Sequence, residues 1–354
     1  MSKARRAPDQ NGSSASSSAE AEVKAQQGTS NELITTLLRE AGVQAGIDES
    51  TTILSLSGGD SSKLGKYDFA ENHDDGRYQW AGDDEERKTQ VDPLPELREK
   101  HEGSNYKDFE TGKAFVKGAT DEHEVDPNDV KQGSLGDCYL MAGMLAVARA
   151  NPEAIKDIIN DRGDGTFDVT LYIRESYYST PVKVTKTIDA RLPVKSGDTP
   201  LYAKTGDKTE DNTELWPALI EKAVAQQKGS YELISGGNIS KGFEFHGATE
   251  LLTGKREGYI PLAAMDSDIA LLQIAYALES KKPCTVDSKN MEDDQTMATE
   301  AKKYNVYGNH AYVPRSVDLS AETVTLDNPW GSHHVENLPV ADFMKFYRSI
   351  RIGA

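Results

Sequence analysis

The chain has 354 residues and a formal net charge of −18 at pH 7, from 40 Lys and Arg against 58 Asp and Glu. This length allows one large domain or two smaller ones, and the acidic excess, without a basic stripe, argues against a nucleic-acid-binding protein. No apolar run of the sequence is long enough to span a membrane, and two cysteines are too few for a disulfide-stapled secreted scaffold.

Residues 1–30 contain seven Ser and six Ala and, beyond Ala, only two apolar side chains. Such a segment buries too little apolar surface to offset its ordering entropy, so we expect a disordered tail. Its charged start is followed by no apolar stretch, which indicates that there is no secretory signal peptide. We therefore expect a cytoplasmic protein or one exported by another route. The Ser-rich composition also resembles the export signals of bacterial effector proteins.

Apolar side chains at helical spacing predict a short amphipathic helix over 31–46, within an accessory or poorly ordered region over 31–90. From 71 to 129 the chain is polar and acidic. The carboxylates there lack the spacing of an EF-hand loop, so we expect a solvated acidic face that leads into the folded core.

Residues 91–354 carry the patterns of a folded α+β domain. Apolar spacing predicts helices over 137–150, 215–224 and 269–278. Alternating patterns predict strands over 167–173, 182–188, 284–287, 311–317 and 322–327, and a short helix and strand close the chain after 343. Helices gather in the first part and strands in the second. We therefore predict a helical lobe over about 125–245 and a β-rich lobe over about 246–354, with a cleft between them.

A cysteine lies at the start of the first predicted helix, in the segment Gln132-Gly-Ser-Leu-Gly-Asp-Cys138. The partial positive charge and free N–H groups of a helix N-terminus favour a thiolate, which is the nucleophilic form. The same N–H groups, with the amide of Gln132, can stabilise an oxyanion. The alternative is that Cys138 is a small buried helix residue. Cys284, in a predicted buried strand, is interpreted as a core residue.

A cysteine nucleophile needs a base and a group that orients the base. His310 lies at the entry to a predicted strand, and Asn328 follows the next strand. A side-chain amide can accept the imidazole N–H and hold the ring toward the sulfur, as in Cys-His-Asn proteases. Each motif alone is weak, because a histidine beside a strand is usually structural. The order along the chain favours the catalytic interpretation.

The sequence resembles the calpain cysteine proteases over roughly residues 125–354, and five blocks in order carry the resemblance. They are Gln132–Cys138, Ile188–Pro193, the long block 215–245, His310-Ala-Tyr and Asn328-Pro-Trp-Gly331. The resemblance implies a papain-like core of two subdomains and a thiol endopeptidase. It implies Cys138 as nucleophile, His310 as general base and acid, and Asn328 as the residue that orients His310.

The resemblance also implies roles for residues around this triad. Gln132 matches the glutamine of the oxyanion hole, and Trp330 matches the tryptophan that shields the His–Asn pair. Gly236 and Gly237 match the block that, with Trp330, lines the substrate cleft.

The chain departs from the calpain pattern at several positions. Tyr139 replaces a tryptophan after the nucleophile, and Asn309 replaces a glycine that meets substrate backbone. Calpains also carry a longer acidic insert after Gly331 that helps bind calcium in the second subdomain. We therefore expect that calcium site to be missing. We predict no cofactor and no metal ligand. The resemblance to calpains is the one reason to keep calcium binding as an alternative.

We expect protein substrates, no nucleic acid and no membrane span, and the sequence leaves the oligomeric state open. One alternative function is a catalytically silent, calpain-like interaction module. Another is an acyltransferase of the transglutaminase type, which uses the same thioester with an amine acceptor. A third is a secreted bacterial effector built on the same protease fold. All triad candidates are present, which favours an active protease.

Overall fold

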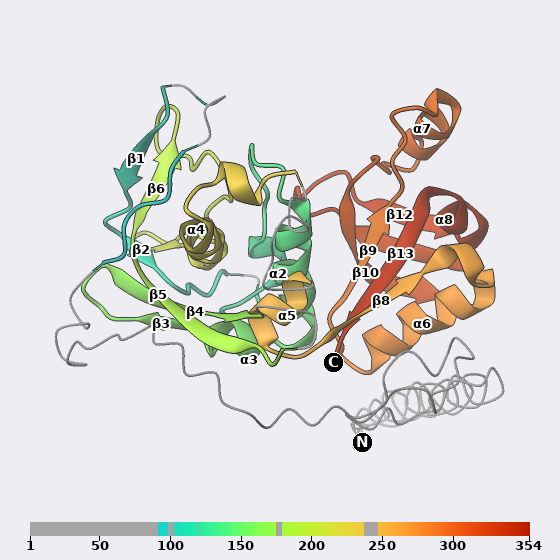
Figure 1. The fold of residues 1–354 in the computed structure, drawn as a ribbon, viewed down its shortest axis with the longest axis horizontal. Helices are drawn as coiled ribbons and strands as arrows, with labels where there is room; N and C mark the ends of the chain where they lie inside the picture. The colour runs from blue at the N-terminus through green and yellow to red at the C-terminus, as the bar shows by residue number, and fades with distance from the viewer. Residues whose placement is uncertain (1–90, 98–100, 102, 120, 175–178, 237–246) are drawn as a thin grey trace, which may run out of the picture. The chain divides into compact units, whose positions relative to one another are not determined.

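The computed structural model describes residues 91–97, 101, 103–119, 121–174, 179–236 and 247–354. The predicted tail 1–30, the helix 31–46 and the accessory region 31–90 lie outside the described residues. The described part builds two hydrophobic cores, which we call the first and second lobes (Figure 1). The prediction of a two-lobed α+β domain is confirmed.

The first lobe combines helices with small sheets. Its helical segments are η5 (Pro127–Asp129), α2 (Cys138–Ala150), α3 (Pro152–Lys156), α4 (Trp216–Lys228), η6 (Glu232–Ile234) and α5 (Ala248–Thr253). Its antiparallel sheet has the order β3 (Ile159–Asp161), β4 (Thr166–Ile173), β5 (Val182–Asp189). Two further pairs are β1 (Asn105–Asp108) with β6 (Arg191–Val194), antiparallel, and β2 (Gly112–Lys113) with β7 (Thr213–Glu214), parallel. The strands predicted over 167–173 and 182–188 are present as β4 and β5, which pair with each other and pack beneath α4 and α5.

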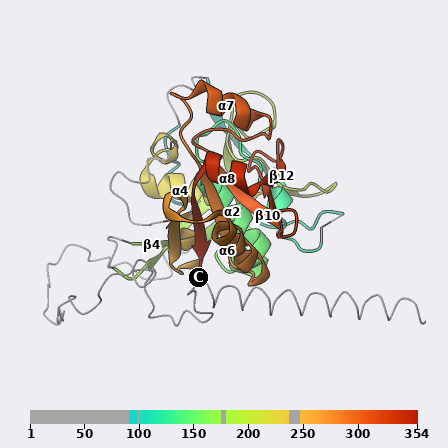
Figure 2. The same ribbon diagram turned by 90° about the vertical axis from the view of Figure 1, so that its right-hand side faces the viewer.

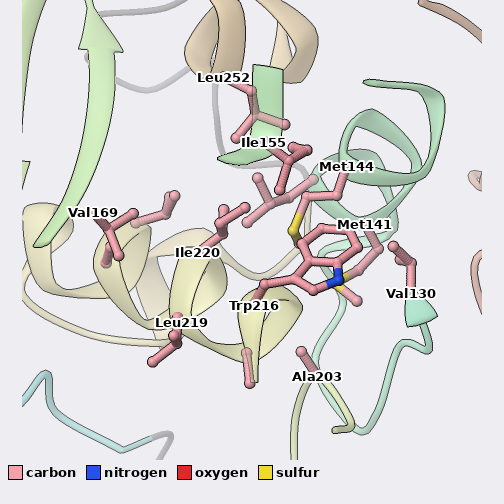
Figure 3. Close-up of a cluster of buried hydrophobic side chains, with 14 of the residues drawn as sticks. Val130, Met141, Met144, Ile155, Val169, Ala203, Trp216, Leu219, Ile220 and Leu252 are labelled. Atoms are coloured by element: carbon pink, nitrogen blue, oxygen red, sulfur yellow. The ribbon is translucent and has the colours of Figure 1, made fainter. Parts of the chain in front are cut away.

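The core of the first lobe gathers around α2 and α4. Figure 3 shows the indole of Trp216 beside Met141 and Met144, with Ile220 and Leu219 further along the same helix. Pro217 is tolerated in the first turn of α4, where its missing N–H has no helical acceptor. Every other residue of β4 is buried, as the alternating pattern predicts.

The second lobe is a six-stranded antiparallel sheet with helices packed on it. The strand order is β12 (Val335–Pro339), β11 (Thr323–Asp327), β10 (Ala311–Asp318), β9 (Cys284–Ser288), β13 (Tyr347–Gly353), β8 (Glu257–Pro261). The helical segments are η8 (Leu262–Ala264), α6 (Ser267–Glu279), α7 (Gln295–Lys302) and α8 (Val340–Phe346). Helix α6 contacts β10, β9, β13 and α8, and Figure 2 shows this lobe turned toward the viewer.

Strand β10 contributes to both cores. Because successive side chains of a strand point to opposite faces, Ala311 and Val313 belong to the first core while Tyr312 belongs to the second. Helix α2 packs against β10 and β9, and its residues from Leu140 to Ala148 are buried all round. This contact joins the helix that begins at Cys138 to the strand that begins after His310.

The predicted helices and strands of 137–354 are present as α2, α4, α6, β4, β5, β9, β10, β11, α8 and β13. Helix α7 was not predicted; its N-cap, Asp294, accepts a hydrogen bond from the backbone N–H of Met297 at 2.8 Å. Helix α5 follows the predicted division near 245 in the chain, yet it packs on α2 and β4 of the first lobe. No helix in the described ranges is long and apolar enough to cross a membrane. Cys284 is buried in β9, and both cysteines are free thiols.

Candidate active site

Cys138 is the first residue of α2 and lies against β10. Asp137 precedes it with a non-helical φ of −114°, and the Asp137 side chain does not cap the helix. The sulfur accepts hydrogen bonds from the backbone N–H groups of Ala311 and Tyr139. The nucleophile candidate of the first lobe therefore lies beside the residue that follows His310 in the second.

Burial raises the pKa of the Cys138 thiol to about 11. The N–H of Ala311 lowers it, while the carboxylates of Asp137 and Asp287 raise it further. The expectation that the helix N-terminus favours a thiolate is wrong for this structure, because burial outweighs the partial charge of the helix end. The thiol keeps its proton near neutral pH, so nucleophilic attack requires a base.

His310 and Asn328 meet at one end of the β10–β11 hairpin. Val313 lies opposite Asp327 in this antiparallel pair, so the residues just outside the two strands are neighbours. His310 Nε2 and Asn328 Oδ1 lie 2.9 Å apart in a buried hydrogen bond. The backbone N–H of Trp330 donates to the same oxygen at 3.0 Å. This network assigns Oδ1 as acceptor and places the imidazole proton on Nε2, which leaves Nδ1 as the basic nitrogen.

Aromatic side chains surround the imidazole of His310, which is 7% exposed. The ring of Tyr312 meets it edge-on, with centroids 4.9 Å apart, and Trp330 lies 4.7 Å away. Trp330 also contacts Tyr307, with ring centroids 4.7 Å apart, and covers the pair from the solvent side with 37% of its surface exposed. Burial lowers the pKa of His310, and the hydrogen bond to Asn328 opposes that shift. The neutral imidazole, the form that acts as a base, is favoured.

Asn309 adopts a left-handed backbone conformation, with φ of +53°. Glycine takes this conformation without steric cost, and asparagine tolerates it better than most residues. Its backbone N–H donates to the carbonyl of Lys289 at 3.0 Å. The replacement of the calpain glycine therefore keeps the backbone shape and adds an exposed polar side chain next to His310.

Gln132 lies beside the nucleophile, but its donors are occupied. Its backbone N–H donates to the carbonyl of Pro329 at 2.8 Å. Its Nε2 donates to the carbonyl of Leu135 at 2.7 Å and to Asp137 Oδ1 at 3.3 Å. Its Oε1 is buried and has no partner among the described residues. An oxyanion would have to displace the longer bond, to Asp137.

Gly236 lies against the loop before the nucleophile. Its N–H donates to the carbonyl of Gly136 at 2.7 Å, and its φ of +78° is in the left-handed region. Trp330 lies on the other side of the triad, against His310. Gly237 lies outside the described residues.

Two buried carboxyl groups adjoin the nucleophile, and neither was predicted to have a role. Asp137 and Glu221 are 0% and 2% exposed, and both oxygens of Glu221 lie 3.0 Å from the backbone N of Ala203. Burial raises the pKa of Asp137 to about 7. Burial also raises the pKa of Glu221, and the charge of Asp137 raises it further. Two adjacent buried carboxylates repel each other, which disfavours the state in which both are charged. Only the fold reveals this pair, since α4 carries Glu221 to the loop before α2.

Part of the acidic region forms a carboxylate cluster in the first lobe. Oxygens of Asp121, Asp129 and Asp207 lie within 4.8 Å of one another. Asp129 is 3% exposed and accepts a hydrogen bond from the indole N–H of Trp216 at 3.1 Å. The expectation of a solvated acidic face is therefore wrong for Asp129. The cluster has no single-loop spacing, because Asp207 lies far along the chain from Asp121 and Asp129.

The cluster has the donor chemistry that a calcium ion takes. Burial raises the pKa of the neighbouring Glu214 to about 9, with the charge of Asp129 adding to the rise. A side chain on Gly118 would collide with the carboxylates of Asp121 and Asp207, so the glycine keeps the backbone close to them. Hard carboxylate oxygens suit Ca²⁺. These residues fit the ion, which would supply the positive charge that offsets their repulsion.

Comparison with known proteins places the chain in a family. The sequence model of the calpain family cysteine proteases matches residues 107–339. Mouse calpain-8 is 29% identical over 210 residues, which are 57% of this chain and 28% of the relative. The catalytic subunit of chicken calpain-2 is 27% identical over 215 residues, which are again 57% of this chain and 28% of the relative. Mouse calpain-9 is 25% identical over 229 residues, which are 63% of this chain and 31% of the relative. The chain thus spans less than a third of the length of these relatives. Since the family model covers most of the chain, the chain belongs to the calpain family of cysteine proteases.

Proposed function

We propose that the chain is a cysteine endopeptidase that hydrolyses peptide bonds in protein substrates through Cys138, His310 and Asn328. The observation that carries the proposal is the buried 2.9 Å hydrogen bond between His310 Nε2 and Asn328 Oδ1. It leaves Nδ1 as a base in the residue next to Ala311, whose backbone N–H bonds the Cys138 sulfur. This complete arrangement favours an active enzyme over a silent interaction module.

The proposed reaction proceeds through a thioester. The Cys138 thiol gives its proton to His310 Nδ1 while the sulfur attacks the peptide carbonyl carbon. His310 then gives that proton to the departing amine, the C–N bond breaks, and the thioester remains. A water molecule attacks the thioester, His310 takes a proton from it, and the thiol is re-formed as the acid leaves. Asn328 holds the Nε2–H throughout and so keeps the ring in the reactive tautomer.

The developing oxyanion needs donors near Cys138. We propose that the first N–H groups of α2 supply one donor and that Gln132 Nε2 supplies another after it leaves Asp137 Oδ1. The 3.3 Å bond to Asp137 is the longer of the two that Gln132 Nε2 makes, so it is the one exchanged. Gly236, with Trp330 and, by the resemblance, Gly237, would line the substrate site.

None of these steps uses a cofactor. A calcium ion at Asp121, Asp129 and Asp207 would stabilise the first lobe by charge compensation, and we propose that its effect on catalysis is indirect. The test is casein cleavage by the purified chain under reducing conditions, with EDTA and with millimolar calcium. The matched control exploits the second free thiol: Cys138→Ala is compared with Cys284→Ala, which alters a buried cysteine of β9.

The expected result is cleavage by the unmodified chain and by Cys284→Ala, and none by Cys138→Ala. Product without added amine would separate hydrolysis from acyl transfer to an amine. Full cleavage by Cys138→Ala would refute the assignment of the nucleophile. The absence of cleavage by the unmodified chain in both conditions would support the silent module.

A further inference from the structure

A second histidine, His334, lies against the backbone of Asn328. The chain between Asn328 and β12 reverses direction within a few residues, because Gly331 and His333 both adopt left-handed conformations, with φ of +71° and +57°. This turn places His334 Nδ1 3.1 Å from the backbone nitrogen of Asn328. No sequence motif predicts a role for His334.

The direction of this hydrogen bond fixes the protonation of the His334 ring. The backbone N–H of Asn328 is a donor only, so Nδ1 must accept through its lone pair and the ring proton must sit on Nε2. Asn328 is 0% exposed. A buried backbone N–H that loses its acceptor cannot form a replacement hydrogen bond with water, which costs free energy. This hydrogen bond therefore helps to hold Asn328 in position.

The same nitrogen also faces a charged group. His334 Nδ1 lies 3.2 Å from Asp327 Oδ1, on β11. Asp327 is bonded in addition by Arg149 from α2 and by Arg315 from β10, and Arg315 in turn binds Glu336 of β12. Nδ1 therefore has two partners that exclude each other. With a lone pair it accepts from Asn328 N–H, and with a proton it would donate to Asp327 Oδ1.

We propose that His334 is a positioning residue for the Asn328–His310 pair, and that protonation of its Nδ1 releases Asn328. The inference rests on the proposed function, in which Asn328 Oδ1 orients His310. In the neutral form, His334 anchors the backbone of Asn328 and thereby its side-chain oxygen. When Nδ1 gains a proton it turns to Asp327, the Asn328 N–H loses its acceptor, and the oxygen that holds His310 loses its support. The His334 side chain is 33% exposed, so solvent protons reach it.

The experiment compares two substitutions with a control histidine. His334→Asn places an oxygen acceptor where Nδ1 stood and does not titrate. His334→Leu fills the volume without an acceptor. The control is His123→Asn, because the His123 side chain is 54% exposed. Among the described residues its one ionic partner is Glu122, at 3.9 Å. Peptide hydrolysis is measured for each from about pH 5.5 to 8, the range in which histidine changes charge.

We expect His334→Leu to lower kcat about tenfold with little change in KM, as for a buried N–H that loses its acceptor. We expect His334→Asn to restore the kcat of the unmodified chain at pH 7.5, and we expect its kcat to decline less toward pH 5.5 than that of the unmodified chain. His123→Asn should follow the unmodified chain throughout. Equal pH profiles for the unmodified chain and His334→Asn would overturn the proposal, even if His334→Leu failed to fold.

A measurement without substrate separates this inference from the proposed function. Nitrogen NMR of histidine-labelled protein reports which ring nitrogen of His334 carries the proton, with the signal assigned by its loss in His334→Asn. An unprotonated Nδ1 at neutral pH supports the inference, and an Nδ1–H tautomer overturns it. Failure of the unmodified chain to cleave any substrate would refute the proposed function and leave this measurement intact.

Discussion

Removal of the Asn328 side chain tests the central hydrogen bond of the site. Asn328→Ala leaves a buried donor, His310 Nε2–H, and a part-buried one, Trp330 N–H, without their shared acceptor. Each unsatisfied buried donor costs about 1–3 kcal/mol. Water entering the vacated space recovers part of this, so we expect about 3 kcal/mol less stability and a Tm lower by roughly 6–12 °C.

The same substitution frees His310 to rotate and to change tautomer. Loss of a positioned general base costs about 10²–10⁴-fold in rate, and Asn328→Ala keeps the imidazole, so we expect a loss near the lower end, about 10²-fold in kcat. The matched control is Asn328→Asp, which keeps an acceptor oxygen for both donors and should retain more activity. Peptide hydrolysis and thermal melts measure both effects. An Asn328→Ala protein with unchanged kcat and unchanged Tm would refute the reasoning.

Other expectations follow from the buried groups. Cys138→Ala should abolish hydrolysis and shift Tm by only about 3 °C or less, since it removes one sulfur atom; a large fall in Tm would assign Cys138 a packing role. Calcium binds carboxylates only after they lose their protons, and burial raises the pKa of Asp129 to about 6. Millimolar calcium should therefore raise Tm more at pH 8 than at pH 6, and Asp129→Asn should remove the effect; equal melts with and without calcium would contradict this. A carboxyl whose pKa is raised on folding stabilises the fold at low pH, and that stability is lost as the pH rises through the folded pKa, about 7 for Asp137. Asp137→Asn should reduce the fall in Tm between pH 6 and pH 8.5, and an unchanged fall would show that Asp137 does not cause it.

Local patterns were sufficient to predict much of the fold. The alternating residues of β4 and the helical spacing of α4 and α6 identify elements whose buried faces are set by periodicity alone. Helix α7 was missed because it is short and half exposed and begins with an aspartate cap rather than an apolar pattern. The strands β4 and β5 were predicted, but their packing beneath α4 was not, since it depends on contacts between distant segments.

The sequence was sufficient to predict which residues form the site, but only part of the environment of those residues. The order of Cys138, His310 and Asn328 identified the triad candidates, and the structure brings His310 and Asn328 into hydrogen-bond contact. The thiol pKa was predicted in the wrong direction, because the depth of burial around a helix end is a property of the tertiary fold. Asp129 was misinterpreted for the same reason. His334 reaches Asn328 only through a turn in which the backbone of His333 is left-handed, and the sequence pattern does not predict this conformation.

The division of β10 between two cores has a consequence for how the molecule unfolds. With Ala311 and Val313 packed in the first core and Tyr312 in the second, the strand cannot leave one core without disturbing the other. Either lobe expressed alone would expose an apolar face: α2 in the first, or the outer side of β10 in the second. The described domain should therefore melt in a single cooperative transition, and the partners in catalysis are assembled and lost together.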